Sequence, residues 1–253
     1  MAENWDYSQQ AAYYKYRPNY PAQVIDCIIE YADLAKCADF NVADIGAGTG
    51  NLTVLLAKYP CKIIAVEPTQ AMSDIGKERT KELKNITWIK ADGCHTTLSE
   101  NTFDLVTFGS SFNVLDRDKA LMETARILKK NGVFSCLWNH RDLNADFQKQ
   151  VDAIIKEVVP DYGYGVRRQD QREIIENSGF FSDIMYMEMD FTFRQTLENY
   201  INAWKSVKNQ YWDLSTPNGK SVFEQICDKI RKKLPSEFSI KYTCRTWNGK
   251  CKK

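Results

Sequence analysis

The stretch Val42-Ala43-Asp44-Ile45-Gly46-Ala47-Gly48-Thr49-Gly50-Asn51-Leu52-Thr53 decides the fold of this 253-residue chain. Its first residues are apolar apart from Asp44 and suit a buried parallel strand. Glycine then stands at every second position of a loop, which removes the Cβ atoms that would keep a ligand away from the backbone. Glu67 follows 21 residues after Gly46, at the end of the next apolar run. A strand, a glycine-rich turn, a helix and then an acid form the layout that binds a nucleoside, with the carboxylate on the ribose hydroxyls.

Two classes of cofactor share this layout, and the spacing of the glycines bears on the choice between them. A dinucleotide fingerprint reads G-x-G-x-x-G and places a helix N-terminus against a pyrophosphate. Here the loop reads G-x-G-x-G and is preceded by Asp44. An acid at the mouth of the loop would repel a pyrophosphate, but it would attract a cationic ligand such as a sulfonium or an ammonium.

At this loop the chain resembles the class I S-adenosylmethionine-dependent methyltransferases. The resemblance implies S-adenosyl-L-methionine as cofactor, S-adenosyl-L-homocysteine as product, and Glu67 as the ribose ligand. It also implies that Asp92 accepts a hydrogen bond from the adenine amino group and that the next backbone N–H meets the ring. The cofactor-binding residues expected from it are Asp44, Gly46, Ala47, Gly48, Gly50, Glu67, Pro68, Met72, Asp92, Gly93, Ser110 and Tyr13.

Helical and strand patterns alternate along the first half of the chain, which predicts right-handed crossovers and a parallel sheet. Together with the resemblance this predicts an α/β fold: a doubly wound, Rossmann-like sheet of seven strands, mostly parallel, with the last strand antiparallel. The strands are expected at 42–45, 61–67, 86–90, 103–108, 133–139, 185–193 and 238–247. The helices are expected at 21–36, 51–58, 69–81, 117–128, 147–159, 170–177, around 200–211 and at 217–234.

An aromatic cluster precedes the first helix and ends in Arg17-Pro18-Asn19-Tyr20-Pro21. Its members are Trp5, Tyr7, Tyr13, Tyr14, Tyr16 and Tyr20. The segment resembles the Y-x-x-x-R-P-x-Y-P start of the trans-aconitate methyltransferase-like group, in which it folds over the cofactor as a lid. The alternative is that the tyrosines only anchor the N-terminus. We therefore expect residues 1–36 to form a helical lid and first helix, and 37–253 to form the methyltransferase domain, with a helical cap from about 141–235.

The composition excludes several other classes of protein. The chain has no apolar run near the ~18 residues of a membrane span, and its N-terminus has neither the basic flank nor the apolar stretch of a signal peptide. Its eight cysteines include no C-x-x-C pair, and it has only two histidines, so neither disulfides nor a zinc site is predicted. These features predict a cytoplasmic protein without a bound metal and without a membrane partner.

The net charge of +1 hides an asymmetry between the two parts of the chain. Residues 194–253 carry 13 Lys and Arg against 5 Asp and Glu, a net of +8, so residues 1–193 carry −7. Basic surfaces favour anionic substrates or nucleic acid. However, no aromatic residues interleave the basic cluster as a base-stacking surface would require, so a solvated helix face is preferred and nucleic acid is not the expected partner.

Methyl transfer is an in-line displacement, so alignment of the acceptor is the main task of the protein. A carboxylate acceptor needs no base, whereas a phenol or a protonated amine does. His140, after the fifth strand, is the candidate base, with an exposed loop histidine as the alternative. Asn113 and Tyr16 are the other catalytic candidates, and the substrate-binding candidates are Tyr13, Asn113, Trp138, Asn139 and Trp204. Trp204 belongs to the stripe Tyr200, Trp204, Val207 and Tyr211, which core packing also explains.

The sequence therefore predicts a methyltransferase acting on a small molecule that offers a carboxylate, hydroxyl or amine. Two alternatives stay open: an enzyme that methylates RNA or protein, and a non-catalytic cofactor-binding protein. Relatives of the trans-aconitate group often read Phe-His-Trp where this chain reads Phe112-Asn113-Val114. The identity of the acceptor is therefore not predicted from the resemblance. The oligomeric state is not predicted either.

Overall fold

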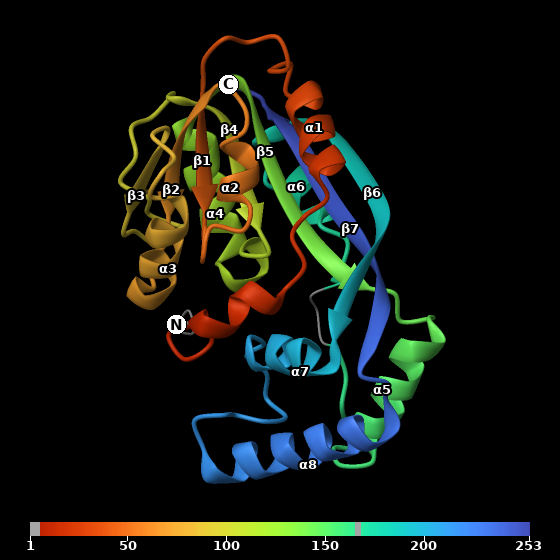
Figure 1. Ribbon diagram of the computed structural model, residues 1–253. Helices are drawn as coiled ribbons and strands as arrows, with labels where there is room; N and C mark the ends of the chain where they lie inside the picture. The colour runs from red at the N-terminus through yellow and green to blue at the C-terminus, as the bar shows by residue number, and fades with distance from the viewer. Residues whose placement is uncertain (1–5, 165–167) are drawn as a thin grey trace.

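The computed structural model describes residues 6–164 and 168–253. Its centre is a seven-stranded sheet in the order β3-β2-β1-β4-β5-β7-β6 (Figure 1). The pairs within β3-β2-β1-β4-β5 are parallel, and β7 is antiparallel to both of its neighbours. The strands are β1 Phe40–Ile45, β2 Cys61–Val66, β3 Ile86–Ile89, β4 Phe103–Gly109, β5 Leu128–Arg141, β6 Phe181–Thr196 and β7 Glu237–Cys251. The predicted α/β sheet with an antiparallel last strand is confirmed.

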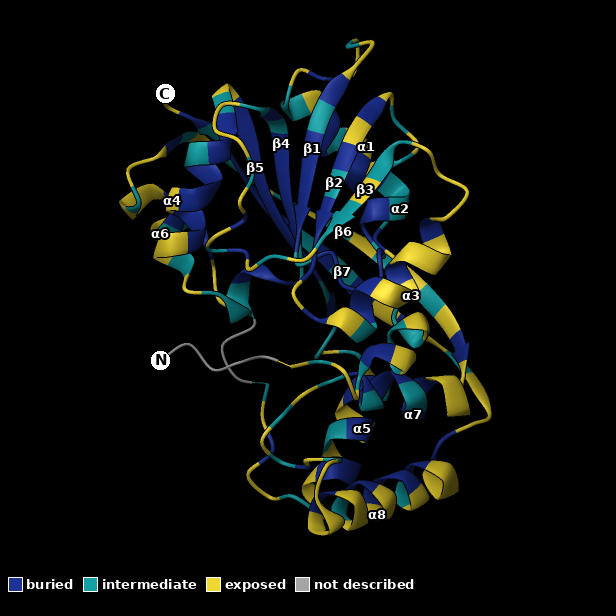
Figure 2. Ribbon diagram, turned by 90° about the vertical axis from the view of Figure 1, so that its left-hand side faces the viewer, coloured by how far each residue is buried: buried dark blue, intermediate teal, exposed yellow. Residues whose placement is uncertain are grey.

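Helices cover both faces of this sheet, because its central strands are apolar on both sides and must be buried twice. One core joins the sheet to α4 and α6, and a second joins the other face to α1 and α2. Figure 2 shows β1, β4 and β5 almost wholly buried between these layers. The helices are η1 Ala11–Tyr16, α1 Ala22–Tyr31, α2 Thr53–Leu56, α3 Gln70–Thr80, η2 Phe112–Val114, α4 Arg117–Ile127, α5 Asp146–Lys156, α6 Arg172–Asn177, α7 Leu197–Lys205 and α8 Pro217–Lys233.

A cap stands beyond the carboxyl edge of the sheet and is carried by three long strands. The last pair of β4 with β5 is Gly109 with Leu137, yet β5 continues to Arg141, and β6 and β7 stay paired as far as Thr196 and Glu237. The helices α5, α7 and α8 pack around this extension in a third core of their own (Figures 1 and 2). Within the range 141–235 expected for the cap, α6 instead packs on the sheet beside α4.

Several element ends differ from the expected ones. The first helix stops at Tyr31 instead of residue 36. Residues 129–132, which lie between the expected helix 117–128 and the expected strand 133–139, belong to β5, because the backbone becomes extended at Leu128 and pairs there with Phe103. The helix expected to carry Tyr200 through Tyr211 ends at Lys205, so its stripe stops at Trp204.

Candidate functional site

The glycine loop leaves β1 in a left-handed backbone that suits glycine. The φ angles of Gly46, Gly48 and Gly50 are +66°, +59° and +79°, a region that costs other residues roughly 1–2 kcal/mol. The loop folds back on β2 because the N–H groups of Gly46 and Ala47 both donate to the Val66 carbonyl, at 2.8 and 3.0 Å. A Cβ at Gly46 would lie 2.5 Å from the Cβ of Ser111. The loop therefore packs directly against the segment that follows β4.

Asp44 precedes this loop near the end of β1 and is fully buried. Its carboxylate accepts a hydrogen bond of 2.6 Å from Thr53 Oγ1, at the start of α2, and one of 3.0 Å from Thr107 Oγ1 on β4. Burial, reinforced by the charge of Glu67, raises the pKa of Asp44 to about 6 against the lowering effect of both hydroxyls. Asp44 thus ties β1, α2 and β4 together and adds negative charge below the loop.

Glu67 joins the glycine loop to the start of α3. Its Oε2 accepts from the Gly48 N–H and its Oε1 from the Thr69 N–H, both at 2.9 Å. Burial raises the pKa of this carboxyl group although both amides favour its ionised form. The Thr69 hydroxyl also favours the ionised form, and part of the acceptor capacity of the carboxylate, about four positions in all, remains for a ribose hydroxyl.

The other expected cofactor ligands surround the same loop to different degrees. Met72 is buried, and its Cε lies 3.2 Å from where a Cβ at Gly48 would stand. Pro68 is exposed beside it. Beyond β3, Asp92 is exposed and accepts from the Cys94 N–H at 2.7 Å, while Gly93 packs on the side chain of Ile45. These residues line the edge formed by the ends of β1, β2 and β3.

Ser110 closes this edge on the β4 side. It has a φ of +61°, and its hydroxyl shares a hydrogen bond of 2.8 Å with the phenol of Tyr20. The next hydroxyl, that of Ser111, donates to the Ile45 carbonyl at 2.5 Å. The segment after β4 is thereby fixed to both the N-terminal segment and the glycine loop.

The N-terminal segment lies between the sheet and the cap, because η1 contacts both α3 and α7 (Figure 1). The ring of Tyr13 lies under the Lys205 ammonium at 5.3 Å, and Tyr16 is partly buried. Arg17 donates from Nε to Ser206 Oγ at 2.7 Å and from its terminal nitrogen to the Ser206 carbonyl at 2.6 Å. The segment therefore bridges the cofactor edge and the cap, as a lid would; Trp5 lies outside the described residues.

The candidates at the end of β5 divide between the two faces of the strand, because successive side chains point to opposite faces. Trp138 Nε1 donates to Asn113 Oδ1 at 2.9 Å on the face covered by α4. Asn139 faces the N-terminal segment, and its amide donates to the carbonyls of Pro18 and Asn19 at 3.3 and 3.1 Å. Asn113 and Trp138 thus form one pair, separate from Asn139 and the tyrosines.

His140 shares the face of Trp138 and is buried instead of lying in an exposed loop. Burial first, and then the charges of Arg168 and Arg245, lower its pKa to about 4. The imidazole is therefore neutral at pH 7 and a weak base. Its Nδ1 has no hydrogen-bond partner among the described residues.

Trp204 lies in the core of the cap, at 5% exposure, with its ring 4.2 Å from the guanidinium carbon of Arg141. Sequence reasoning did not select Arg141, nor the two threonines that hold Asp44. Thr53 and Thr107 carry no local signal, because their pairing depends on which strands become neighbours. Arg141 did carry one, as a charged residue two positions after the expected strand 133–139.

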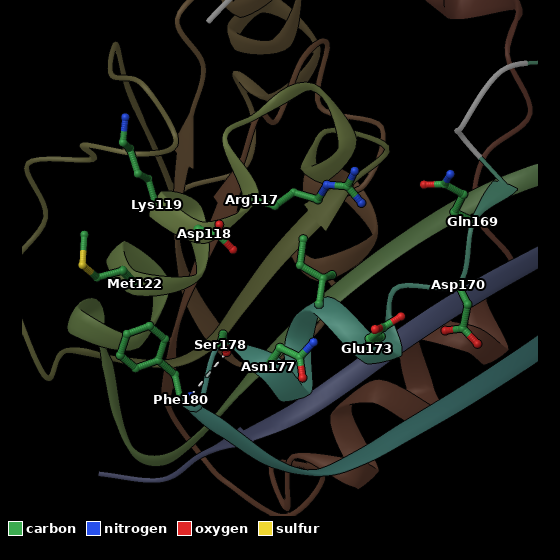
Figure 3. A pocket seen from close by; sticks show the side chains of 11 residues that line it. Arg117, Asp118, Lys119, Met122, Gln169, Asp170, Glu173, Asn177, Ser178 and Phe180 are labelled. Atoms are coloured by element: carbon green, nitrogen blue, oxygen red, sulfur yellow. Dashed lines mark hydrogen bonds between the residues drawn. The ribbon is translucent and has the colours of Figure 1, made fainter.

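An open groove of about 760 Å³ lies elsewhere, between α4 and α6 (Figure 3). It is lined by exposed apolar side chains, Met122 and Phe180, and by the charged residues Arg117, Lys119 and Glu173. Its lining includes none of the strand-end residues described above. Among the residues that the structure describes, no helix is long and apolar enough to cross a membrane.

A glycine loop after β1, an acid after β2 and this strand order define the fold of the class I S-adenosylmethionine-dependent methyltransferases. Residues 43–136 match the family described as Methyltransferase domain. The solved structure of a protein from Anaeromyxobacter dehalogenans, described as a type II methyltransferase, superposes with a TM-score of 0.63 at 15% identity and covers 92% of this chain and 97% of that one, which shows the shared fold.

Sequence relatives agree with this assignment. An uncharacterized methyltransferase of Mycobacterium tuberculosis is 29% identical over 148 residues, 58% of this chain and 57% of the relative. The demethylmenaquinone methyltransferase of Staphylococcus saprophyticus is 30% identical over 142 residues, 54% of this chain and 61% of the relative. The chain thus spans about 60% of the length of these relatives. Residues 43–136 thus resemble a methyltransferase domain, and the chain as a whole has the class I methyltransferase fold.

Proposed function

We propose that this protein transfers the methyl group of S-adenosyl-L-methionine to a small-molecule acceptor by in-line displacement and releases S-adenosyl-L-homocysteine. The observation that carries the proposal is the junction of Glu67 with the glycine loop: a buried carboxylate that accepts from two backbone N–H groups and keeps acceptor capacity for a ligand. The cofactor supplies an electrophilic methyl group. The chain's part is to bind it, align the acceptor and exclude water.

The residues present fit such a cofactor. The left-handed glycines give a backbone surface free of side chains, and the buried hydroxyl of Thr49 in the same loop has no hydrogen-bond partner among the described residues. Glu67 would take the ribose hydroxyls, Asp92 and Gly93 the adenine edge, and Met72 one face of the ring. Tyr13 and Ser110 would close the site from the N-terminal segment and from the end of β4.

For the acceptor we propose the space between the end of β5, the N-terminal segment and the cap. Among the candidates, Tyr13, Tyr16 and Asn139 lie on the side of the N-terminal segment, whereas Asn113 and Trp138 pair on the opposite face of β5. We assign His140 a neutral, hydrogen-bonding role here, since a pKa of about 4 lies well below the pH at which a general base is most effective. An acceptor that is already a nucleophile at neutral pH, such as a carboxylate, fits this arrangement best.

Two observations favour a small molecule over RNA or protein. The matched relative from Staphylococcus saprophyticus is named for a quinone substrate. Much of the basic C-terminal portion is engaged in ion pairs, with Lys229 and Lys233 both on Glu157 and Arg231 on Glu198. The Arg17-Pro18-Asn19-Tyr20-Pro21 segment further supports a place near the trans-aconitate methyltransferase-like group, and the eight free thiols suit a cytoplasmic location.

Calorimetry with S-adenosyl-L-homocysteine tests the proposal on wild type, Glu67→Ala and Glu78→Ala. Glu78 is an exposed acid of α3 paired with Lys81, so its loss should leave affinity unchanged. Loss of Glu67 should weaken binding roughly 10- to 100-fold, since a hydrogen bond to a charged group contributes about 1.5–3 kcal/mol. Absence of binding to wild type would overturn the proposal, and equal affinity of both variants would overturn the assigned geometry.

A further inference from the structure

Arg141 is the last residue of β5 and lies where the sheet meets the cap. Its guanidinium carbon is 4.2 Å from the centroid of the Trp204 ring and 5.0 Å from that of Tyr200, both on α7. Its Nε donates to the phenol oxygen of Tyr242 on β7 at 3.3 Å. As a residue, Arg141 is partly buried.

The charge of Arg141 lies among aromatic side chains. None of the ion pairs among residues 6–164 and 168–253 includes it. The phenols around it are neutral at pH 7, because burial raises the pKa of Tyr200 to about 12 and raises that of Tyr162 as well. An arginine fork without a carboxylate, next to aromatic faces, is arranged to receive a planar oxyanion.

One further donor beside Arg141 lacks an acceptor. Tyr200 is fully buried, and its oxygen accepts from Trp204, but its hydroxyl proton has no acceptor among the described residues. Buried polar atoms are normally paired. Two donor groups with unused capacity, the guanidinium of Arg141 and the hydroxyl of Tyr200, therefore meet at one place.

The position along β5 shows which part of the acceptor would reach this place. Arg141 is four residues beyond Leu137, the last partner of β4, which places it about 13 Å past the edge of the sheet at roughly 3.3 Å per residue. Transfer of the methyl group is expected at that edge, beside the glycine loop. Arg141 is thus remote from the reacting atom.

We propose that Arg141, with the Tyr200 hydroxyl, binds an oxyanion at the end of the methyl acceptor remote from the atom that is methylated. The inference rests on the proposed function and adds the substrate class: an elongated molecule with a terminal carboxylate or phosphate. Recognition at that end positions the acceptor along β5 and leaves the reacting atom at the sheet edge.

Arginine side-chain NMR tests this directly. In ¹⁵N-arginine-labelled protein the Nε–Hε signal of Arg141 is assigned by its absence in Arg141→Lys, a variant that keeps the positive charge and the contact with the rings. Wild type is then titrated with sodium phosphate, sodium acetate or sodium chloride at equal ionic strength. Phosphate or acetate should shift the signal in a saturable way, and chloride should not. If phosphate reaches half-saturation at a concentration tenfold lower than acetate, the terminal group of the acceptor is a phosphate. The reverse order identifies a carboxylate.

Tryptophan fluorescence during the same titrations compares wild type with Arg141→Lys, Arg141→Met and Arg194→Met. Arg194 is an exposed arginine of β6 paired with Glu237, so its variant should respond like wild type. Arg141→Met should lose the response, and Arg141→Lys should keep a response at least fivefold weaker. The inference is overturned if the chemical shift of the Arg141 Nε–Hε signal does not change with phosphate or acetate, or changes equally with chloride. It is also overturned if the fluorescence response of Arg141→Lys equals that of wild type.

Calorimetry with S-adenosyl-L-homocysteine separates this inference from the proposed function. All three variants should bind the product with the affinity of wild type, since Arg141 lies away from the cofactor edge. If wild type binds the product but the Arg141 signal does not respond to oxyanions, only the inference about Arg141 is refuted. Wild type that does not bind the product refutes the proposed function.

Discussion

Gly46 and Gly179 share a left-handed backbone but differ in what surrounds them. Their φ angles are +66° and +75°, but a Cβ would lie 2.5 Å from Ser111 Cβ at Gly46 and would meet nothing within 4 Å at Gly179. Gly179→Ala measures the backbone cost alone, which we expect to be about 1–2 kcal/mol of unfolding free energy. Gly46→Ala should cost roughly 1–3 kcal/mol more, because it also overpacks the loop.

Urea denaturation of both variants gives these free energies. Gly46→Ala should in addition lower the affinity for S-adenosyl-L-homocysteine, whereas Gly179→Ala should not. Equal destabilisation by the two substitutions would mean that the loop and Ser111 move apart freely, contrary to the close contact seen here.

Asp44 is the residue whose ionisation should be visible in the stability of the cofactor-free protein. Its pKa of about 6 lies above the model-peptide value of 3.8, so between about pH 4 and pH 6 the folded state binds more protons than the unfolded state. Stability contributed by this group is therefore present below pH 4 and is lost as the pH rises through 6. At pH 8 the cost reaches up to about 3 kcal/mol.

Asp44→Asn should avoid that cost, because an amide stays neutral and can still bond to both Thr53 and Thr107. We expect the variant to be the more stable protein at pH 8 and to lose this advantage towards pH 4.5, as followed by urea denaturation without cofactor. Asp161→Asn, at an exposed position, serves as the control. A stability difference that does not vary with pH would contradict the assignment.

Residue by residue, the candidate site was predictable where its signal is local in the sequence. The alternating glycines and Glu67 after the next strand were visible in the chain, and the structure brings them within hydrogen-bond distance. The burial of Asp44 was not visible, because Thr107 lies 63 residues away and becomes its partner only once β4 pairs with β1. The lowered pKa of His140 likewise depends on folding, first through the burial of the imidazole and then through the charges of Arg168 and Arg245.

At the level of elements, the predictions were best where a strand is apolar along its length. They were weakest for β5, β6 and β7, whose outer parts carry polar residues. Lys129 resembles the basic end of a helix, but its ammonium bonds to both oxygens of Asp104 on β4, at 2.8 and 2.9 Å. Helix α7 ends early for a similar reason: the Ser206 carbonyl accepts from Arg17, a residue 189 positions away. Contacts between residues so far apart in the chain leave no periodic pattern in the sequence, so they could not be predicted from it.

The contact between Arg17 and Ser206 also leads to a prediction about the N-terminal segment. Arg17→Ala removes both of its hydrogen bonds and its stacking on Tyr14, at 4.0 Å, so residues 11–16 should lose their attachment to α7. We expect faster amide exchange in these residues and about tenfold weaker binding of S-adenosyl-L-homocysteine, the equivalent of roughly 1.4 kcal/mol.

Ser206→Ala is the matched variant, because it removes one acceptor and keeps the carbonyl that Arg17 also bonds. Its effects should be in the same direction and clearly smaller. If exchange in residues 11–16 is the same in Arg17→Ala as in wild type, the segment is held by other contacts and the arginine is not its latch.

On the scale of the whole molecule, the sheet and the cap share their strands. The cap has its own core, with Phe223, Ile226 and Ile230 of α8 buried in it, but β5, β6 and β7 run through both parts without a break. Opening the cap alone would strip these strands of their covering. We therefore expect the cap to open only with the sheet, in one cooperative transition.

Hydrogen exchange with and without S-adenosyl-L-homocysteine tests this. A ligand at 100 times its Kd raises the free energy of global unfolding by about 2.7 kcal/mol, so amides that exchange only through global unfolding should slow about 100-fold. The buried turns of α8 should slow as much as β1 and β4, although they lie in the cap and not at the cofactor edge, while amides in the exposed turn at 213–216 should not change. Slowing in the sheet without slowing in α8 would show that the cap opens on its own. In that case the acceptor would enter when the cap opens. If the cap unfolds only together with the sheet, the N-terminal segment, which Arg17 attaches to α7, is the part that must move to admit the acceptor.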